Sequence, residues 1–309
     1  MKTPGRQRAS NFELHHLRYF IAVVEERNFE RAAARLGIAQ PGLSQQIIAL
    51  EAIVGLPLID RTRRSVNLTP TGQVLYEDAV TIVAHADAAL AQLQRAGRGE
   101  TGKISIGYVA SAAYSGVLTD RLTTFRLGLP DVELQLVEME MRQQLEKIKE
   151  GVLDFGYIRP PATIPAELAT TIVLREPLVA VLPTKHGHAT KTAVRLSDLH
   201  AESFITPRQP SDIGFHAHTL NACGEAGFKP KINANGRDFT TIASMVAVGI
   251  GIALVPKSLD CLRLPGVRYL PLVDNDVLTE LAVVYRKSEG NPAVKAFIAH
   301  HRSGLADAF

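Results

Sequence analysis

The chain has 309 residues, of which 46% are hydrophobic and 21% are charged, and this composition excludes disordered and fibrous proteins. Its longest uncharged run, residues 239–256, contains serine, threonine and glycine, so it lacks the ~20 mainly apolar residues that span a bilayer. No apolar leader follows the basic residues of the N-terminus, which argues against secretion. We therefore expect a cytoplasmic protein of two or more domains that does not associate with a membrane.

The net charge of +3 is distributed unevenly along the chain. Residues 1–64 hold 10 Lys and Arg against 6 Asp and Glu, whereas the remaining residues hold 24 against 25. A basic module on a nearly neutral body suits binding to a polyanion, because neutralised phosphates release condensed counterions. On charge alone, a solvated basic face remains the alternative.

Apolar spacing predicts two short helices at the start of this basic module. The first ends near Glu26, and its apolar face comprises Leu14, Leu17, Phe20, Ile21 and Val24. Asn28 can cap a second helix over residues 29–36, and Gly37 can end that helix in a left-handed conformation.

A third helix is predicted after the turn at residues 37–39, because Pro41 suits a first helical turn. Its inward apolar face comprises Leu43, Ile47, Leu50 and Val54. Its outward face comprises Pro41, Ser44, Gln45 and Ile48. Two short helices, a tight turn and an outward face with hydrogen-bonding side chains predict a helix-turn-helix.

A short, strand-like segment follows the third helix and runs to Asn67. It contains Arg61, Arg63 and Arg64. A basic segment next to a helix-turn-helix is typical of a wing that lies along the phosphates or in the minor groove.

Several motifs of the N-terminal region occur in one order: Asn28-Phe29-Glu30-Arg31-Ala32-Ala33, Gln40-Pro41-Gly42-Leu43-Ser44-Gln45-Gln46-Ile47, Leu50-Glu51 and Leu68-Thr69-Pro70-Thr71-Gly72. In order and spacing they resemble the DNA-binding domain of LysR-type transcriptional regulators. The resemblance implies an α/β protein with an N-terminal winged helix-turn-helix, a long dimerisation helix and a C-terminal two-lobed effector domain of the periplasmic-binding-protein type. The chain departs from many relatives at Gln45, where they have a basic residue, and at Gly42, where they have proline or alanine.

The resemblance also implies domains, partners and DNA-binding residues. It places the DNA-binding domain at residues 1–68, the dimerisation helix at 69–98 and the effector-binding domain at 99–309, with lobe I at about 103–160 and 278–309 and lobe II at about 161–277. The implied partners are double-stranded promoter DNA, a small-molecule effector, a second copy in a homodimer that pairs into a dimer of dimers, and RNA polymerase. The implied DNA-binding residues are Asn28, Arg31, Gln40, Pro41, Ser44, Gln45, Arg61 and Arg64.

The residues themselves support this layout. Thr69 and Pro70 can open a helix of nearly thirty residues with an Ala- and Leu-rich stripe, which can coil with its twin from a second subunit or pack against its own chain. From Lys103 onward, short apolar runs alternate with helical stretches, which is an α/β pattern. We expect the chain to cross between the lobes near residues 160–161 and 273–274, and a crevice between lobes suits a small molecule.

Candidate effector residues follow from their location and from the resemblance. Ser111 and Ala112 follow the first strand of the second domain, where a hydroxyl and backbone amides can meet an anion. Arg159 ends the strand 155–158, and its guanidinium suits a carboxylate or sulfonate, the alternative being a surface arginine that bridges the lobes. In relatives that sense intermediates of aromatic degradation, the corresponding hydroxyl contacts a ligand carboxylate and an arginine stands at the corresponding place. The resemblance adds a second-lobe rim and an apolar wall, comprising Thr206, Pro207, Gly214, Phe215 and Phe239. Met141 replaces a small hydroxyl residue that is common in these relatives.

Other apparent motifs predict no catalysis, cofactor or metal site. Asp154-Phe155-Gly156 lacks the rest of a kinase signature, and residues 249–251 precede a strand where a dinucleotide-binding loop would follow one. The His-x-His pairs at residues 186–188 and 216–218 fall in a loop and a helix, which suits chelation poorly. Cys223 and Cys261 are too few for a disulfide scaffold and leave open only a redox-sensing pair. We therefore expect a regulator switched by a small, anionic effector, with an effector-free DNA-binding regulator or an enzyme as alternatives.

Overall fold

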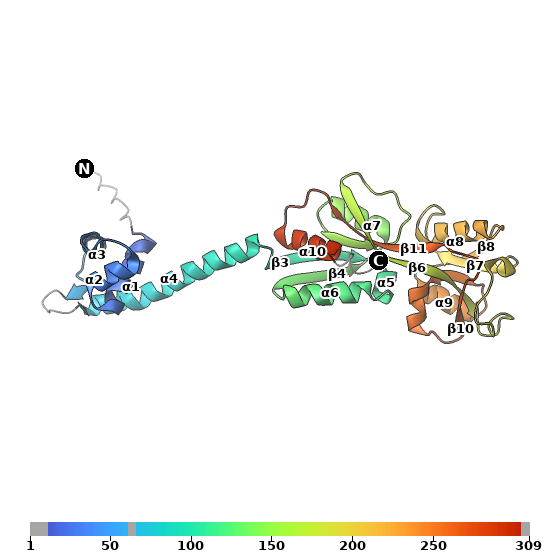
Figure 1. The fold of residues 1–309 in the computed structure, drawn as a ribbon, viewed down its shortest axis with the longest axis horizontal. Coiled ribbons are helices and arrows are strands. Elements are labelled where there is room, and N and C mark those ends of the chain that lie inside the picture. The colour runs from blue at the N-terminus through green and yellow to red at the C-terminus, as the bar shows by residue number, and fades with distance from the viewer. Residues whose placement is uncertain (1–11, 61–65, 304–309) are drawn as a thin grey trace, which may run out of the picture. The chain divides into compact units, whose positions relative to one another are not determined.

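The computed structural model describes residues 12–60 and 66–303. The chain divides into two compact units, Met1–Gln94 and Arg95–Phe309, whose elements are drawn in Figure 1. The first unit contains α1 (Leu14–Glu26), α2 (Phe29–Leu36), α3 (Gln40–Val54), β1 (Ile59–Asp60), β2 (Asn67–Leu68) and most of α4 (Pro70–Gly97).

The helix boundaries of the first unit depend on short-range hydrogen bonds that the sequence predicted. The side chain of Asn28 accepts hydrogen bonds from the amides of Glu30 and Arg31 and so caps α2. Gly37 ends α2 with φ of 69°, and its amide donates to the carbonyls of Ala33 and Ala34. The turn between α2 and α3 is therefore fixed locally, as a helix-turn-helix requires.

The core of the first unit lies between α1, α2 and α3. Leu17 and Phe20 are buried as predicted, but Ala22 and Val23 are buried as well, whereas Leu14, Ile21 and Val24 are only half-buried. The predicted apolar face of α1 is thus partly wrong. The reason is that α1 packs against both α2 and α3, so its buried stripe is displaced from the one that periodicity indicated.

The two short strands β1 and β2 pair antiparallel, with Ile59 opposite Leu68 and Asp60 opposite Asn67. Residues 61–65, which include Arg61, Arg63 and Arg64, lie outside the described residues. The structure therefore shows β1 and β2 at the two ends of the predicted wing, and the basic segment between them stays a prediction.

Helix α4 begins close to these strands, and its first turn requires glycine. The hydroxyl of Thr69 accepts a hydrogen bond from the amide of Gly72 at 2.9 Å and donates to the carbonyl of Pro57 at 2.8 Å. A Cβ atom on Gly72 would lie 2.1 Å from the carbonyl oxygen of Leu58. Only glycine therefore allows α4 to lie this close to the loop before β1.

The second unit contains one mixed sheet and a separate strand pair among its described residues. The sheet has the order β10-β6-β11-β5-β3-β4, with β9 paired to β6, and β7 pairs with β8. The strands are β3 (Gly102–Tyr108), β4 (Val132–Glu138), β5 (Phe155–Ile158), β6 (Leu168–Pro183), β7 (Ser203–Pro207), β8 (Lys231–Gly236), β9 (Ala253–Pro256), β10 (Val267–Pro271) and β11 (Leu278–Arg286). The helices are α5 (Ala110–Tyr114), α6 (Val117–Gly128), α7 (Met141–Lys149), α8 (Gly214–Glu225), α9 (Phe239–Ala247) and α10 (Pro292–Ser303), with the short helices η1 (Leu196–Leu199) and η2 (Lys257–Leu262).

Two hydrophobic cores define two lobes of this unit. The core of lobe I includes Ile106, Phe155 and Phe297, and α10 packs there against α6 and β3. The core of lobe II includes Phe204 and Ile242, and α8 and α9 pack there against β7 (Figure 1). The predicted two-lobed α/β architecture is confirmed.

The first passage between the lobes lies further along the chain than the sequence indicated. Residues 168–177 of β6 still pair with β11 of lobe I, whereas residues 178–183 pair with β9 and β10 in lobe II. The strand therefore crosses at Pro177–Leu178 and not at residues 160–161. The dipeptide Pro160-Pro161 does end β5, but Ala162 and Ile164 after it still pack on α7 and β11.

Candidate functional site

Helix α3 presents its predicted outward face to solvent. Leu43, Ile47 and Leu50 are fully buried, while Pro41, Gln45 and Ile48 are exposed on the other side. At the start of this face, the amide of Gln40 donates to the hydroxyl of Ser44 at 3.0 Å. Hydrogen-bonding side chains are thus held on the exposed side of α3, and their contact with base edges stays a prediction.

Two other predicted DNA-binding residues have partners within the first unit. Asn28 uses its side-chain oxygen as the cap of α2, which leaves its amide nitrogen to donate elsewhere. The guanidinium of Arg31 donates to Glu26 from two nitrogens, at 3.1 and 2.8 Å, although the side chain is 69% exposed. Both residues support the junction between α1 and α2, and their contacts with DNA stay predictions.

The second unit contains a cleft of about 330 Å³ that both lobes line. Among the predicted effector residues, Ser111, Arg159, Pro207, Phe215 and Phe239 belong to its wall. The others, Ala112, Thr206 and Gly214, are buried and do not line it. Thr206, for example, accepts a hydrogen bond from the amide of Asn235 at 2.8 Å inside lobe II.

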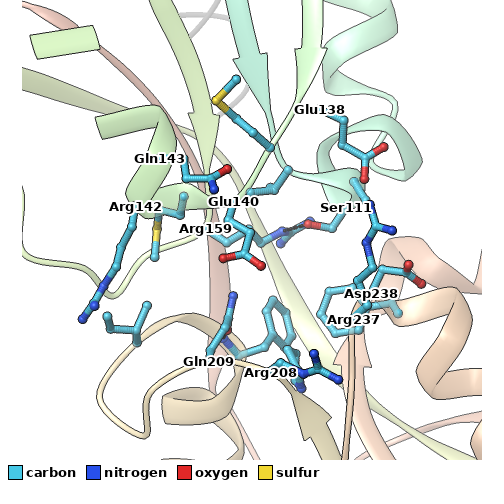
Figure 2. A pocket seen from close by; sticks show the side chains of 18 of the residues that line it. Ser111, Glu138, Glu140, Arg142, Gln143, Arg159, Arg208, Gln209, Arg237 and Asp238 are labelled. Carbon is cyan, nitrogen blue, oxygen red and sulfur yellow. Dashed lines mark hydrogen bonds between the residues drawn. The ribbon is translucent and has the colours of Figure 1, made fainter. Parts of the chain in front are cut away.

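Arg159 and Ser111, both predicted to meet the effector, are in direct contact with each other. The Nε of Arg159 donates directly to the hydroxyl of Ser111 at 3.1 Å (Figure 2), and its Nη1 donates to the hydroxyl of Thr279 at 3.3 Å. Its Nη2 donates to a carboxylate oxygen of Glu176 at 2.7 Å. The guanidinium is only 5% exposed, so it is a buried cation whose counterion the protein itself supplies.

The environment of this arginine sets its electrostatics. Burial lowers the pKa of Arg159, and the carboxylate of Glu176 opposes that effect. An arginine stays protonated even so. The Cζ atom of Arg159 lies over the Phe215 ring of lobe II, 5.6 Å from its centre. The alternative of a surface arginine is wrong, because the side chain is buried. Its contact with an effector stays a prediction, and no sequence pattern indicated its burial.

Charged and amide side chains that sequence reasoning missed surround the mouth of the cleft (Figure 2). They are Glu138, Glu140, Arg142, Arg208, Gln209, Arg237 and Asp238. Arg208 directly follows β7 and Arg237 directly follows β8, so both stand at the carboxyl ends of parallel strands, where ligands commonly bind. Asp238 is engaged as the cap of α9, because its carboxylate accepts hydrogen bonds from Thr240 and from the amide of Thr241.

The motifs that predicted no catalysis, cofactor or metal site have structural roles. Asp154 accepts a hydrogen bond from the amide of Ser105 at 2.9 Å and pairs with Arg286, which confirms a turn into a buried strand. His216 and His218 bond separately to the carbonyls of Gln209 and Pro160. Among the described residues, no group of three or more His, Cys, Asp or Glu is arranged to hold a metal.

Both units match models of a single protein family. Residues 14–73 match the bacterial regulatory helix-turn-helix protein, lysR family, and residues 97–306 match the LysR substrate binding domain. The chain belongs to the LysR family of transcriptional regulators. This LysR-type chain is therefore a regulator and not an enzyme, and its similar proteins are named accordingly.

Three comparisons place this LysR-type regulator among known proteins. It is 38% identical to the uncharacterized HTH-type transcriptional regulator YnfL of Escherichia coli over 96% of this chain and 99% of that protein. The crystal structure of full-length CbnR complexed with its target DNA matches with a TM-score of 0.81 and 27% identity, over 94% of this chain and 99% of that one. The effector binding domain of BenM with its effector benzoate matches with a TM-score of 0.58 and 28% identity, over 67% of this chain and 93% of that one.

In the described part of this chain, no helix is both long and apolar enough for a membrane crossing.

Proposed function

We propose that this regulator binds double-stranded promoter DNA and is switched by a small, carboxylate-bearing metabolite in the cleft of its second unit. The observation that carries the proposal is that walls from both lobes line this cleft. A ligand that prefers one arrangement of the lobes shifts the population toward it. Such a shift changes how subunits pack, and hence the spacing of paired DNA-binding domains and the bend of the promoter.

The proposed DNA-binding assembly is a homodimer that pairs into a dimer of dimers, with RNA polymerase as a further partner. Helix α4 supports the dimer, since it exposes large apolar side chains that water solvates poorly: Val74, Val80, Ile82, Leu90 and Leu93. Coiling with the same helix of a second copy would cover them. The dimer would then present two α3 helices to a pseudo-palindromic site, with the wing residues Arg61 and Arg64 on the phosphates.

Base readout by α3 is tested by replacing Gln45 or Ser44 with alanine. Each change is expected to cost ~1–3 kcal/mol on a cognate site selected from random DNA and much less on unselected DNA, because side chains at base edges carry specificity. Gln46→Ala is the matched control, since this glutamine of the same helix points at His15 instead. Equal losses on both DNAs, measured by fluorescence anisotropy, would contradict the assignment.

The proposed effector is a carboxylate with an apolar, aromatic-derived body. Arg208 and Arg237 are exposed on the lobe II side of the mouth, and Phe215 and Phe239 form an apolar wall beside them with ring centres 4.7 Å apart. Glu138 and Glu140 would repel an anion at the lobe I rim, so the anionic group is best placed away from them, toward Arg159 and the two arginines of lobe II. Benzoate, the effector of the similar BenM domain, has the same chemistry.

Benzoate is therefore expected to stabilise the full chain against heat. At about 100 times its Kd, a ligand that binds only the folded state contributes ~2.7 kcal/mol. The measurement is the Tm in sodium benzoate against sodium chloride at equal ionic strength, with benzyl alcohol as the neutral control. A shift that benzyl alcohol reproduces would remove the need for a carboxylate, and the absence of any shift would favour a regulator without this effector.

A further inference from the structure

The carboxylate of Glu176 accepts hydrogen bonds from both lobes. Glu176 is 6% exposed and precedes Pro177, where β6 leaves the ladder of lobe I. Its Oε1 accepts from Arg159 of lobe I at 2.7 Å and from the hydroxyl of Ser258 at 3.1 Å, and its Oε2 accepts from the amide of Ser258 at 2.6 Å. Ser258 lies in η2, next to Leu259 of the lobe II core.

The same carboxylate neutralises the buried arginine of the cleft. Arg159 lines the cleft, and three of its five N–H groups donate to Ser111, Thr279 and Glu176. Thr279 in turn donates to the backbone carbonyl of Glu176 at 3.3 Å. An incoming anion thus meets a cation whose charge is already compensated, at a place where the dielectric screening is weak.

We propose that Glu176 is a built-in anion that masks Arg159 from the effector and transmits the effector's presence to lobe II. The inference rests on the proposed carboxylate effector. A ligand carboxylate beside Arg159 is repelled by the negative charge of Glu176 on the same guanidinium, so its gain from Arg159 is limited unless Glu176 moves away. When Glu176 moves away from Arg159, its hydrogen bonds with Ser258 change as well. Binding in the cleft and the position of η2 thus become coupled. Glu176 then sets both the affinity of the cleft for anions and the strength of the switch.

The decisive variant is Glu176→Gln, which keeps the shape and an acceptor for Ser258 but removes the competing charge. Sodium benzoate, titrated into the full chain at constant ionic strength, is expected to bind this variant about tenfold more tightly than the wild type. Glu280→Gln is the matched control. Its carboxylate accepts from Arg175 of β6 at 3.0 Å, but Glu280 is 31% and Arg175 43% exposed, so the affinity should change less than about twofold.

Coupling to lobe II is read from hydrogen exchange of the amides in η2. Benzoate is expected to accelerate exchange at Ser258 in the wild type, because the amide loses the charged acceptor that now protects it. In Glu176→Gln the exchange of η2 is expected to be the same with and without benzoate, since no charge remains to be displaced. Unaltered exchange at Ser258 in benzoate-saturated wild type would overturn the coupling.

The outcomes separate this inference from the proposed function. If the wild type binds benzoate and Glu176→Gln binds it no more tightly, the proposed function stands and the masking is refuted. If only Glu176→Gln binds benzoate, the masking is supported and benzoate is the wrong effector. If neither binds it, the masking is refuted, because exposing the charge created no anion site.

Should Glu176→Gln fail to fold, Ser258→Ala serves as the second variant. It keeps the ion pair but removes one of the two bonds from Glu176 to η2. About twofold tighter benzoate binding is expected, and an unchanged affinity would refute the inference.

Discussion

Replacing Arg159 by methionine is expected to lower the free energy of unfolding of the second unit by about 3–5 kcal/mol, because it leaves a buried carboxylate without its counterion. Glu176 is 8% exposed on its side chain and has no other cationic partner among its described hydrogen bonds. The measurement is urea unfolding of the full chain followed by circular dichroism, since the chain contains no tryptophan.

Two further variants identify the cause of this loss. Arg175→Met removes the neighbouring arginine on β6, whose ion pair with Glu280 is 43% and 31% exposed, and should cost no more than about 1 kcal/mol. Combining Arg159→Met with Glu176→Gln removes both buried charges, so much of the lost stability should return. Equal losses for Arg159→Met and Arg175→Met would show that the buried pair contributes no more than a surface pair.

The fold of the DNA-binding unit was predictable because its signals are local. Asn28 caps α2 two and three residues ahead of the amides it serves, and Gly37 closes the same helix. Such signals depend on spacing within one turn, which a single sequence displays directly. The burial of Ala22 and Val23 and the partial exposure of Leu14, Ile21 and Val24 were not predicted, since they depend on how α1 packs against two helices at once.

The chemistry of the cleft was only partly predictable, because its partners are distant in sequence. Arg159 was identified from its place at a strand end, but Ser111 lies 48 residues away, Glu176 17 and Thr279 120. Glu176 stands beside Arg175 and Pro177 in the sequence, where a charged pair before a proline is typical of a solvated turn. Its burial follows from the passage of β6 between lobes, which apolar patterning alone does not locate.

Another buried titratable group lies in lobe I, away from the cleft residues. His301 is fully buried on α10, where its Nδ1 bonds to the carbonyl of Phe297 at 3.0 Å and its Nε2 to the hydroxyl of Tyr157. The rings of Phe155 and Phe297 lie 4.8 and 4.4 Å from it, centre to centre. Burial lowers the pKa of His301 from 6.5 to about 4, and the positive charges of His300 and Arg121 act in the same direction, against the bond to Phe297. The imidazole is therefore neutral in the folded protein, with Nδ1 as donor and Nε2 as acceptor.

This histidine is expected to make the second unit sensitive to acid. Its pKa is lower in the folded than in the unfolded chain, so its contribution is complete above pH 6.5 and is lost as the pH falls toward about 4. At about 1.4 kcal/mol per pH unit, the loss across this window is on the order of 3 kcal/mol. His301→Gln should lower stability at neutral pH but flatten its decline below pH 6.5, because the buried imidazole no longer takes up a proton on unfolding. His200→Gln, at an exposed histidine of lobe II, should leave the decline as steep as in the wild type. Urea unfolding of the full chain across this pH window measures all three proteins, and an equally steep decline in His301→Gln would show that the pair with Tyr157 does not hold the imidazole neutral.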